Sequence, residues 1–461
     1  MSLSEVPAPE GALRSTLDAR QAVLDQVRAM LIRQLYLRRE PDEIDPDTPL
    51  FGSGLGLDSV DAVELLVSLE TTSGIRVPDN RAAVNALRTV NSIVDLLLGA
   101  PPGSKAGEGS ADPEKQLPAV RTSVALSEQP HVRCLRVSGE GAVQLLDRVC
   151  PRELFVRDSQ MMHTLLLDEA GTTAADVYVC RDDEAFILLV EERPGFSAHD
   201  HLRAAAAGPG VEIQPLDGTH QLVSLDGPYA WELMAELVGP HVVGLPYMSF
   251  FHGEGWTCFR AGKTGEYGYA LLAERARAAE LIAKVKELGR PFDLGEVGQD
   301  VLDQCALENG FFNVRREGSA GLTPLELQLQ WRVSRRKEGF IGAEALARRR
   351  QEPAGRRLQC LIAPQPLVAG EAVSVEGKPV GTVLNAGLSP SLGAWAALAI
   401  LELPFAYPGV DLEMGTRRAR TACLPLVINR SLLVSPHRDS YHNRTARELP
   451  PLVPGGGRAP V

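Results

Sequence analysis

The chain has 461 residues, of which 44% are apolar and 23% charged, and its formal net charge is −12. This length predicts two to four units, each with its own core, and the composition is typical of soluble globular proteins. The negative charge argues against a general nucleic-acid surface. No apolar run approaches a membrane span, and the N-terminus lacks the features of a signal peptide. We therefore expect a cytoplasmic protein without nucleic-acid or membrane partners.

Residues 1–17 are expected to form a tail, and residues 18–100 a small all-α bundle of four helices. Apolar residues at helical spacing mark the first helix at Leu24, Val27, Leu31 and Leu35. A glycine-rich turn leads into a second helix near Ser59. On this helix we expect Asp61, Glu64 and Glu70 to be exposed to solvent. The face expected to be buried contains Val60, Val63, Leu66, Val67 and Leu69. Residues 91–98 predict the last helix, with Asn91 as its cap.

Ser59 stands where the turn meets the second helix. A helix N-terminus offers free backbone N–H groups and a partial positive charge, which favour a phosphate ester at this point. The alternative is that Ser59 is only an N-cap, because serine is a preferred capping residue.

The order of short motifs around Ser59 resembles an acyl carrier protein. The motifs are Asp-Thr-Pro-Leu-Phe at 47–51, Leu-Gly-Leu-Asp-Ser at 55–59, Val-Glu-Leu at 63–65 and Ile-Arg-Val-Pro-Asp at 75–79. The resemblance implies that Ser59 carries covalent 4′-phosphopantetheine, and that Asp61 and Glu64 belong to an acidic face for basic partners. The implied partners are a phosphopantetheinyl transferase and enzymes that load acyl or aminoacyl groups.

Residues 101–122 are rich in Pro, Gly and Ser and lack periodic apolar residues, so they are expected to be a linker. A flexible linker of about 18 residues has a root-mean-square span near 25 Å. It would hold the helical unit at an effective concentration of order mM around the second part of the chain. We therefore expect intramolecular docking, with the second part acting on what the arm carries.

The second part is expected to be α+β over residues 123–358, followed by a small β-barrel or sandwich over 359–440 and a tail over 441–461. Strands are indicated at 131–137, 163–168, 175–181 and 185–191, and helices at 230–238, 275–288 and 296–307. The seven cysteines stand singly and predict reduced thiols rather than disulfides or zinc. His199 and His201 lack a matched third ligand, so no metal site is predicted.

Six motifs in the second part follow the order of the glycine cleavage T protein, a folate-dependent aminomethyltransferase. They begin with Gly-Thr-Thr-Ala-Ala-Asp-Val-Tyr-Val at 171–179 and Thr-Gly-Glu-Tyr-Gly-Tyr at 264–269. They continue with Leu-Glu-x-Gly at 307–310, Thr-Pro-Leu-Glu at 323–326, the Lys-x-x-Phe-Ile-Gly stretch from 337, and the Gly-Thr-Val stretch from 381. The resemblance covers residues 125–430 and implies three subdomains around a tetrahydrofolate site, ending in a C-terminal β-barrel.

The resemblance also implies roles for individual residues. Asp176 matches the catalytic aspartate near the reacting pterin nitrogens, and a carboxylate there can stabilise a cation and accept a proton. Glu266 matches the glutamate that grips the pterin edge, since a carboxylate accepts two hydrogen bonds from an aminopyrimidinone. Phe259 and Glu191 are two further implied folate contacts. A strand-end carboxylate and a solvated hairpin charge are the alternatives for Asp176 and Glu266.

Several positions depart from the family pattern. Ala306 stands where the family has an arginine that helps to hold folate, Lys263 replaces a tyrosine, and Glu191 replaces an asparagine. The Lys-Gly-Cys motif of the iron-sulfur-assembly branch is absent, which favours the transferase branch. The basic run at 348–350 is a candidate surface for the acidic helix, or simply a solvated face.

These features predict a folate-dependent one-carbon transferase acting on a phosphopantetheine-tethered substrate, in specialised-metabolite biosynthesis. One rival is a non-catalytic carrier scaffold whose degenerate folate domain docks partner enzymes. Another is a transferase or lyase that uses the old folate site for a different ligand.

Overall fold

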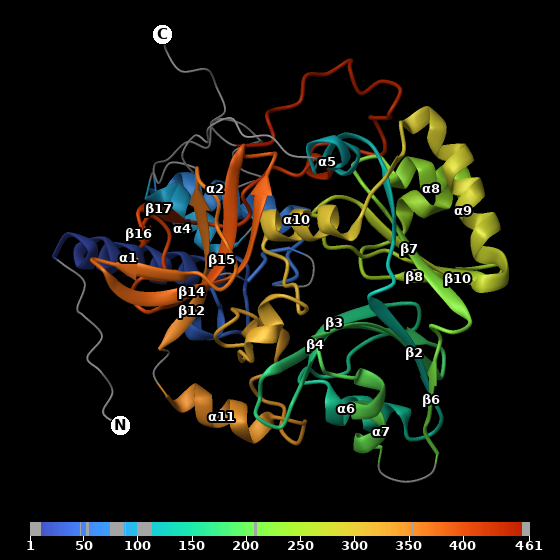
Figure 1. Cartoon of the computed structure of the whole chain (residues 1–461), viewed down its shortest axis with the longest axis horizontal. Coiled ribbons are helices and arrows are strands. Elements are labelled where there is room, and N and C mark those ends of the chain that lie inside the picture. Colours follow the sequence, from blue (N-terminus) through green and yellow to red (C-terminus); the bar gives the residue numbers. More distant parts are fainter. Residues whose placement is uncertain are drawn as a thin grey trace.

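The computed structural model describes residues 11–46, 48–51, 55–73, 87, 89–98, 113–206, 210–352 and 355–453. These residues form an N-terminal helical bundle, two mainly antiparallel sheets and a closed barrel (Figure 1). The blue helices of the bundle lie beside the orange strands of the barrel in Figure 1, and Arg20 Nη2 contacts Cys423 Sγ at 4.0 Å between them. In this part of the chain, no helix is long and apolar enough to cross a membrane.

The bundle comprises α1 (Gly11–Gln34), η1 (Pro41–Glu43), α2 (Ser59–Ser73) and α4 (Val90–Leu97). Helix α1 begins inside the predicted tail, and α4 is capped by the Thr89 side chain, which accepts from Ser92 N at 3.1 Å, rather than by Asn91. Residues 74–86 of the predicted bundle lie outside the described residues. The bundle core contains Leu24, Val27, Leu31, Leu65, Leu69 and Ile93.

The predicted buried face of α2 is confirmed at Leu69 and, in part, at Leu66, but it is wrong at the three valines. Val60, Val63 and Val67 are each more than half exposed, whereas Leu65 and Leu69 are buried against α1 and α4. The helix has two apolar stripes, and periodicity within one helix does not decide which stripe its neighbours cover. The exposed stripe begins one residue after Ser59.

The first sheet has five strands in the order β3-β4-β5-β2-β6, and all its pairs are antiparallel. Helices α6 (Ala142–Val149) and α7 (Ala198–Ala205) pack their apolar faces into the core on this sheet. Four strands agree closely with the predicted ranges: β2 (Val132–Ser138), β3 (Met161–Leu167), β4 (Thr173–Asp182) and β5 (Ala185–Glu192). The fifth, β6 (Glu212–Pro215), was not predicted.

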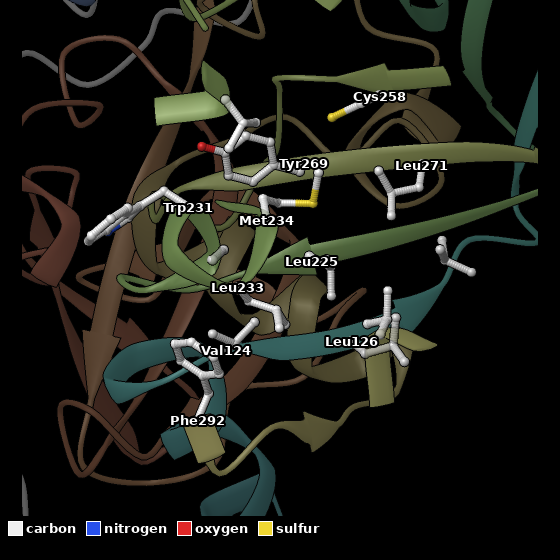
Figure 2. Packing of buried hydrophobic residues seen from close by; sticks show 14 of the residues in the cluster. Val124, Leu126, Leu225, Trp231, Leu233, Met234, Cys258, Tyr269, Leu271 and Phe292 are labelled. Atoms are coloured by element: carbon white, nitrogen blue, oxygen red, sulfur yellow. The ribbon is translucent and has the colours of Figure 1, made fainter. Parts of the chain in front are cut away.

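The second sheet has six strands in the order β11-β1-β7-β10-β9-β8. Helix α8 (Ala230–Val238) packs Leu233 and Met234 against the core that contains Leu225, Tyr269 and Leu271 of the strands (Figure 2). Trp231 of the same helix also belongs to this cluster. Near it lie α9 (Arg275–Gly289), η2 (Pro240–Gly244) and η3 (Arg290–Phe292). The strands are β1 (Ala125–Glu128), β7 (His220–Asp226), β8 (Phe250–Gly253), β9 (Trp256–Phe259), β10 (Gly268–Glu274) and β11 (Gly295–Glu296).

The two ends of the second part are more ordered than predicted. The last ten residues of the predicted linker form α5 (Pro113–Thr122), and residues 101–112 lie outside the described residues. Tyr441, the first residue of the predicted tail, is buried against Phe292. Buried side chains at Leu117, Val120 and Arg121 explain why α5 docks, although the segment has too few apolar residues to predict it.

Helix α10 (Gln299–Asn309) connects the second sheet to the barrel, through η4 (Glu317–Ala320), η5 (Gln330–Arg332) and α11 (Ala343–Gln351). The C-terminal strands form a closed barrel in the order β12-β15-β14-β13-β16-β17, so the predicted barrel is confirmed. Its elements are β12 (Arg356–Ala363), β13 (Ala372–Val375), β14 (Lys378–Ser389), β15 (Ala394–Glu402), β16 (Asp411–Met414), β17 (Arg417–Ala422) and η6 (Arg430–Leu432).

Candidate active site

Asp176 lies on β4 directly opposite Glu191 of β5, and Tyr178 of β4 lies opposite His163 of β3. Opposite residues of an antiparallel pair share a face of the sheet, as do residues two apart on one strand. The register therefore gathers these four side chains on one face. His163 stacks on Tyr178 with ring centroids 4.2 Å apart.

The Asp176 carboxylate is surrounded by basic groups. Its Oδ1 lies 2.6 Å from His163 Nε2 and 2.8 Å from Arg332 Nη1, and its Oδ2 lies 2.7 Å from Lys263 Nζ. Burial alone would raise the pKa of this carboxyl, but His163, Lys263 and Arg332 together hold it well below its usual value. Asp176 is therefore a buried anion. The strand-end alternative does not describe it.

Lys263 bridges the two carboxylates that the register brings together. Its Nζ lies 2.5 Å from Glu191 Oε1 as well as 2.7 Å from Asp176 Oδ2. Burial would lower the pKa of this amine, but the two carboxylates outweigh it and raise the pKa. Lys263 is thus an ammonium ion that occupies the space between two predicted folate contacts.

A first cavity of about 100 Å³ opens beside this ion pair. Asp176, Glu191 and Lys263 line it, together with Asp226 at the end of β7. Asp226 Oδ1 accepts from Thr264 Oγ1 at 3.0 Å, and burial raises the pKa of this carboxyl to about 6. Ala306 and Arg315 also line the cavity, so a guanidinium is present although the family's arginine is missing at 306.

Glu266 and Phe259 are outside the lining of the first cavity. The Glu266 carboxylate accepts from Ser431 N and Ser431 Oγ, both at 2.7 Å, and from Arg430 N at 3.0 Å. Arg121 Nη1 lies 3.4 Å from it, and the side chain is fully buried, so it is not a solvated hairpin charge. Phe259 is buried against Phe250, with ring centroids 5.3 Å apart.

A second cavity of about 600 Å³ lies on the other side of the Asp176 cluster. His163, Tyr178 and Arg332 line it, but Asp176 does not. Two residues of α2, Ala62 and Leu66, line the same cavity. Tyr178 lines both cavities, so the His163–Asp176 pair stands in the wall between them.

Ser59 is the first residue of α2, and Asp58 caps the helix. Asp58 Oδ1 accepts from Val60 N at 2.7 Å and from Asp61 N at 3.0 Å, while Asp61 Oδ2 accepts from Asp58 N at 2.8 Å. This reciprocal pattern is a capping box. The capping role that the alternative gave to Ser59 is therefore filled by its neighbour. Ala62 and Leu66 follow Ser59 by about one and two helical turns.

His163, Arg332, Asp226 and Arg121 belong to these sites and were not predicted. A histidine inside the apolar run at 161–167 was an available signal, because an unpaired polar residue is costly in a buried strand. The two arginines gave no local signal: their carboxylate partners lie more than 140 positions away in the chain.

Comparison with known proteins agrees with this architecture. Residues 25–97 match the phosphopantetheine attachment site, residues 110–337 the GCVT N-terminal domain, and residues 356–426 the glycine cleavage T-protein C-terminal barrel domain. The chain is thus a carrier domain fused to a transferase-type domain. More particularly, it is a phosphopantetheine-binding domain joined to both domains of the glycine cleavage T-protein family.

Curated relatives of the second part are aminomethyltransferases. That of Thermotoga neapolitana is 27% identical over 315 residues, which cover 65% of this chain and 86% of the relative. That of Flavobacterium psychrophilum is 25% identical over 318 residues, covering 67% and 88%. The glycine cleavage system aminomethyltransferase T of Bartonella henselae has the same fold, with a TM-score of 0.61 at 24% identity, covering 73% of this chain and 97% of that one.

Proposed function

We propose that the chain is a folate-dependent one-carbon transferase that acts on a group held as a phosphopantetheine thioester on its own carrier domain. The observation that carries the proposal is the second cavity, because residues of α2 and residues of the Asp176 cluster line the same space. An arm attached at Ser59 would enter beside Ala62 and Leu66. Its cargo would meet His163, Tyr178 and Arg332.

The first cavity has the chemistry for a pterin. Asp226, Glu191 and Asp176 offer carboxylate oxygens to the N–H groups of an aminopyrimidinone edge and to a cationic nitrogen. Lys263 already holds a cationic nitrogen between two of them. At about 100 Å³ the cavity is smaller than the roughly 300 Å³ typical of organic ligand sites. Binding therefore requires Lys263 to withdraw.

Tetrahydrofolate, when bound, would supply or accept the one-carbon unit. The protein would do the rest: Asp226 and Glu191 orient the ring, and Asp176, an anion at neutral pH, stabilises positive charge at the reacting nitrogen. Glu266 would act indirectly, since its contacts to Arg121, Arg430 and Ser431 fasten the neighbouring loop to the segment after the barrel. Phe259 would support the sheet behind the site.

The carrier implies a phosphopantetheinyl transferase and loading enzymes as partners. The exposed stripe of Val60, Val63 and Val67, with the exposed Glu64 beside it, supports docking of such enzymes next to Ser59. The fusion supports a role in the biosynthesis of a specialised metabolite, because a covalent carrier is useful where intermediates pass between enzymes.

The test uses the full chain in its apo form, to which a phosphopantetheinyl transferase transfers propionyl-phosphopantetheine from propionyl-CoA in one step. Added ¹³C-methylene-tetrahydrofolate should place the label on the arm, read by mass spectrometry of the released pantetheine. Ser59→Ala should carry neither arm nor label. Labelled folate that leaves a loaded arm unchanged would contradict the proposed transfer.

The carrier-scaffold rival is favoured by the small first cavity, and folate binding separates it from the transferase. A ligand that binds only the native state at 100 times its Kd stabilises by about 2.7 kcal/mol. Tetrahydrofolate should therefore raise the thermal midpoint of the holo-protein. An unchanged midpoint at saturating folate would favour the scaffold, or a different ligand in this cavity.

A further inference from the structure

We propose that His163 is the catalytic base that removes a proton from the carbon beside the thioester carbonyl of the tethered group, and that Arg332 holds the oxygen on which the negative charge develops. The inference rests on the proposed delivery of cargo by the carrier. The proposed substrate class is an acyl thioester that carries a hydrogen on the carbon next to its carbonyl group.

Position is the first argument. His163 and Arg332 both line the cavity that α2 also lines, whereas Asp176 faces the other cavity. A group brought by the carrier would therefore reach the imidazole and the guanidinium before it could reach the carboxylate. Asp176 stands behind His163, as the carboxylate partner of a histidine base does.

We assign the tautomer of His163 from its contacts. Arg332 Nη1 lies 3.1 Å from His163 Nε2, but it also lies 2.8 Å from Asp176 Oδ1, to which it donates. His163 Nε2 and Asp176 Oδ1 are 2.6 Å apart, and two acceptors that close would repel, so a proton lies between them. Because basic neighbours keep the Asp176 pKa low, that proton belongs to Nε2. Burial and Arg332 lower the His163 pKa to about 4, so the ring is neutral and Nδ1 keeps its lone pair. Among the described residues, no hydrogen bond is made to Nδ1.

Arg332 supplies the opposite charge. Its Nη1 donates to Asp176 Oδ1 at 2.8 Å, its side chain is 4% exposed, and its Nε–H is buried without a partner in the described part of the chain. A buried, unpaired N–H is costly and is satisfied when a ligand oxygen arrives. A thioester oxygen that gains negative charge is such a ligand.

The step is balanced without a further reagent. The C–H bond beside the carbonyl breaks, and its proton forms an N–H bond with Nδ1. Its electron pair moves onto the thioester oxygen, beside the Arg332 guanidinium. The new imidazolium donates Nε2–H to Asp176, which offsets part of the cost that burial and Arg332 impose on the charged ring. The resulting enolate is a carbon nucleophile, which is what a transfer of a one-carbon electrophile to the tethered group needs.

The lining of the second cavity suits this step. Apolar residues make up most of its lining around the polar cluster, and Leu66, Leu327, Leu329 and Leu424 are among them. A dry wall strengthens the attraction between the enolate oxygen and Arg332. It also favours apolar cargo over charged cargo, because a charged group would lose its hydration on entry.

The test is solvent-hydrogen exchange on the loaded full chain, with no folate present. Holo-protein carrying a propionyl or phenylacetyl group, confirmed by intact mass, is placed in D₂O, and deuterium on the acyl carbon is read by mass spectrometry of the released arm. The wild type should exchange, and His163→Gln should exchange at least about 100-fold more slowly. His199→Gln, on α7, is the matched histidine control and should exchange as the wild type.

Imidazole rescue separates a base from a structural histidine. Added imidazole should restore exchange to His163→Ala, because the truncated side chain leaves room in the cavity, and a merely structural role would gain nothing. Arg332→Met should slow exchange while leaving the loaded mass unchanged. Wild-type exchange in His163→Gln, absence of rescue, or no exchange with either probe in a loaded wild type overturns the proposal.

The outcome is independent of the transferase proposal. Exchange without label transfer from ¹³C-methylene-tetrahydrofolate would sink the transfer and leave His163 as the base. Label transfer without hydrogen exchange in the loaded protein would support the transferase and overturn the role of His163 as the base.

Discussion

At the scale of single residues, charge compensation decides which groups are ionised. Asp176 is flanked by basic neighbours and is a stable anion, whereas Asp226, also buried and only 3% exposed, accepts hydrogen bonds from hydroxyl groups instead. The same residue type therefore has a lowered pKa on one wall of the first cavity and a raised pKa on the other. A carboxyl whose pKa is raised towards neutral pH can either accept a hydrogen bond or, when protonated, donate one.

Asp226→Asn should make the protein more stable at pH 7.5. The folded pKa of about 6 lies above the ordinary unfolded value, so the native state holds this proton more tightly and stability rises as pH falls through about 6. At pH 7.5 the ionised group costs about 3 kcal/mol, which the amide avoids. Thermal midpoints at pH 4, 6 and 7.5 should show a gain that disappears by pH 4, together with weaker folate binding. Asp303→Asn is the opposite control, because Arg315 stabilises that carboxylate. A destabilised Asp226→Asn at pH 7.5 would contradict this account.

Lys263→Met should destabilise the protein by about 3–5 kcal/mol at pH 7, because it leaves two buried carboxylates uncompensated. The pKa of Lys263 is raised, so its contribution to stability persists until the pH rises through that value. The pKa of Asp176 is lowered, so its contribution to stability is lost only in acid. Denaturant unfolding should show a deficit at pH 7 that persists at pH 4, because the Asp176 pKa lies well below its usual value. The control is Lys286→Met, whose partner Glu296 is exposed and whose loss should cost less than about 1 kcal/mol. Equal losses in the two variants would be the contrary result.

At the scale of elements, the strands of the first sheet could be predicted, because their apolar runs are bounded by clear turns. The α2 face could be predicted only in part. Periodicity places Leu69 inside correctly, but the two apolar stripes are locally equivalent, and only packing against α1 and α4 selects the stripe that contains Leu65. Helix α5 could not be predicted, because Arg121 is fixed by partners far along the chain: Glu308 at 2.6 Å, the Thr264 carbonyl and Asn429. The motifs single out Asp176 as a candidate site residue. They do not indicate its neighbours His163 and Arg332, because these residues reach Asp176 from other segments of the chain.

Gly342 joins the turn after β3 to the start of α11. It has φ +86°, and an added Cβ would lie 2.5 Å from the Asp168 carbonyl oxygen and 3.1 Å from Gly171 Cα. Gly342→Ala should therefore lower the thermal midpoint more than Gly339→Ala, where φ is +77° but nothing lies within 4 Å. The control isolates the clash, since both variants bear the ~1–2 kcal/mol cost of a left-handed alanine. Similar losses would mean that the turn shifts freely.

At the scale of the whole molecule, polar contacts join the described residues of the carrier to the transferase, and in one of them Gln330 Nε2 donates to Asp45 Oδ2. Arg335 lies 3.6 Å from Asp42 and 3.9 Å from Glu43, and these exposed pairs contribute little. They are near the predicted basic run at 348–350, and Arg349 and Arg350 line the same groove as Asp42 and Glu43. Solvent-exposed pairs such as these can separate at little cost, which suits a carrier that must also reach loading enzymes. Covalent attachment through residues 101–112 then has to supply the local concentration.

Cutting the connection should therefore slow transfer without changing the chemistry. With a specific protease site inserted within residues 101–112, the loaded chain can be compared before and after cleavage. The fused carrier works at an effective concentration of order mM, so cleaved protein at about 10 μM should lose roughly 100-fold in the single-turnover rate. The loss should diminish in proportion as the protein concentration rises. The inserted but uncut chain is the control for the insertion itself. A cleaved protein whose rate is unchanged and independent of concentration would show that the interface alone holds the carrier in place, and that docking is tight rather than transient.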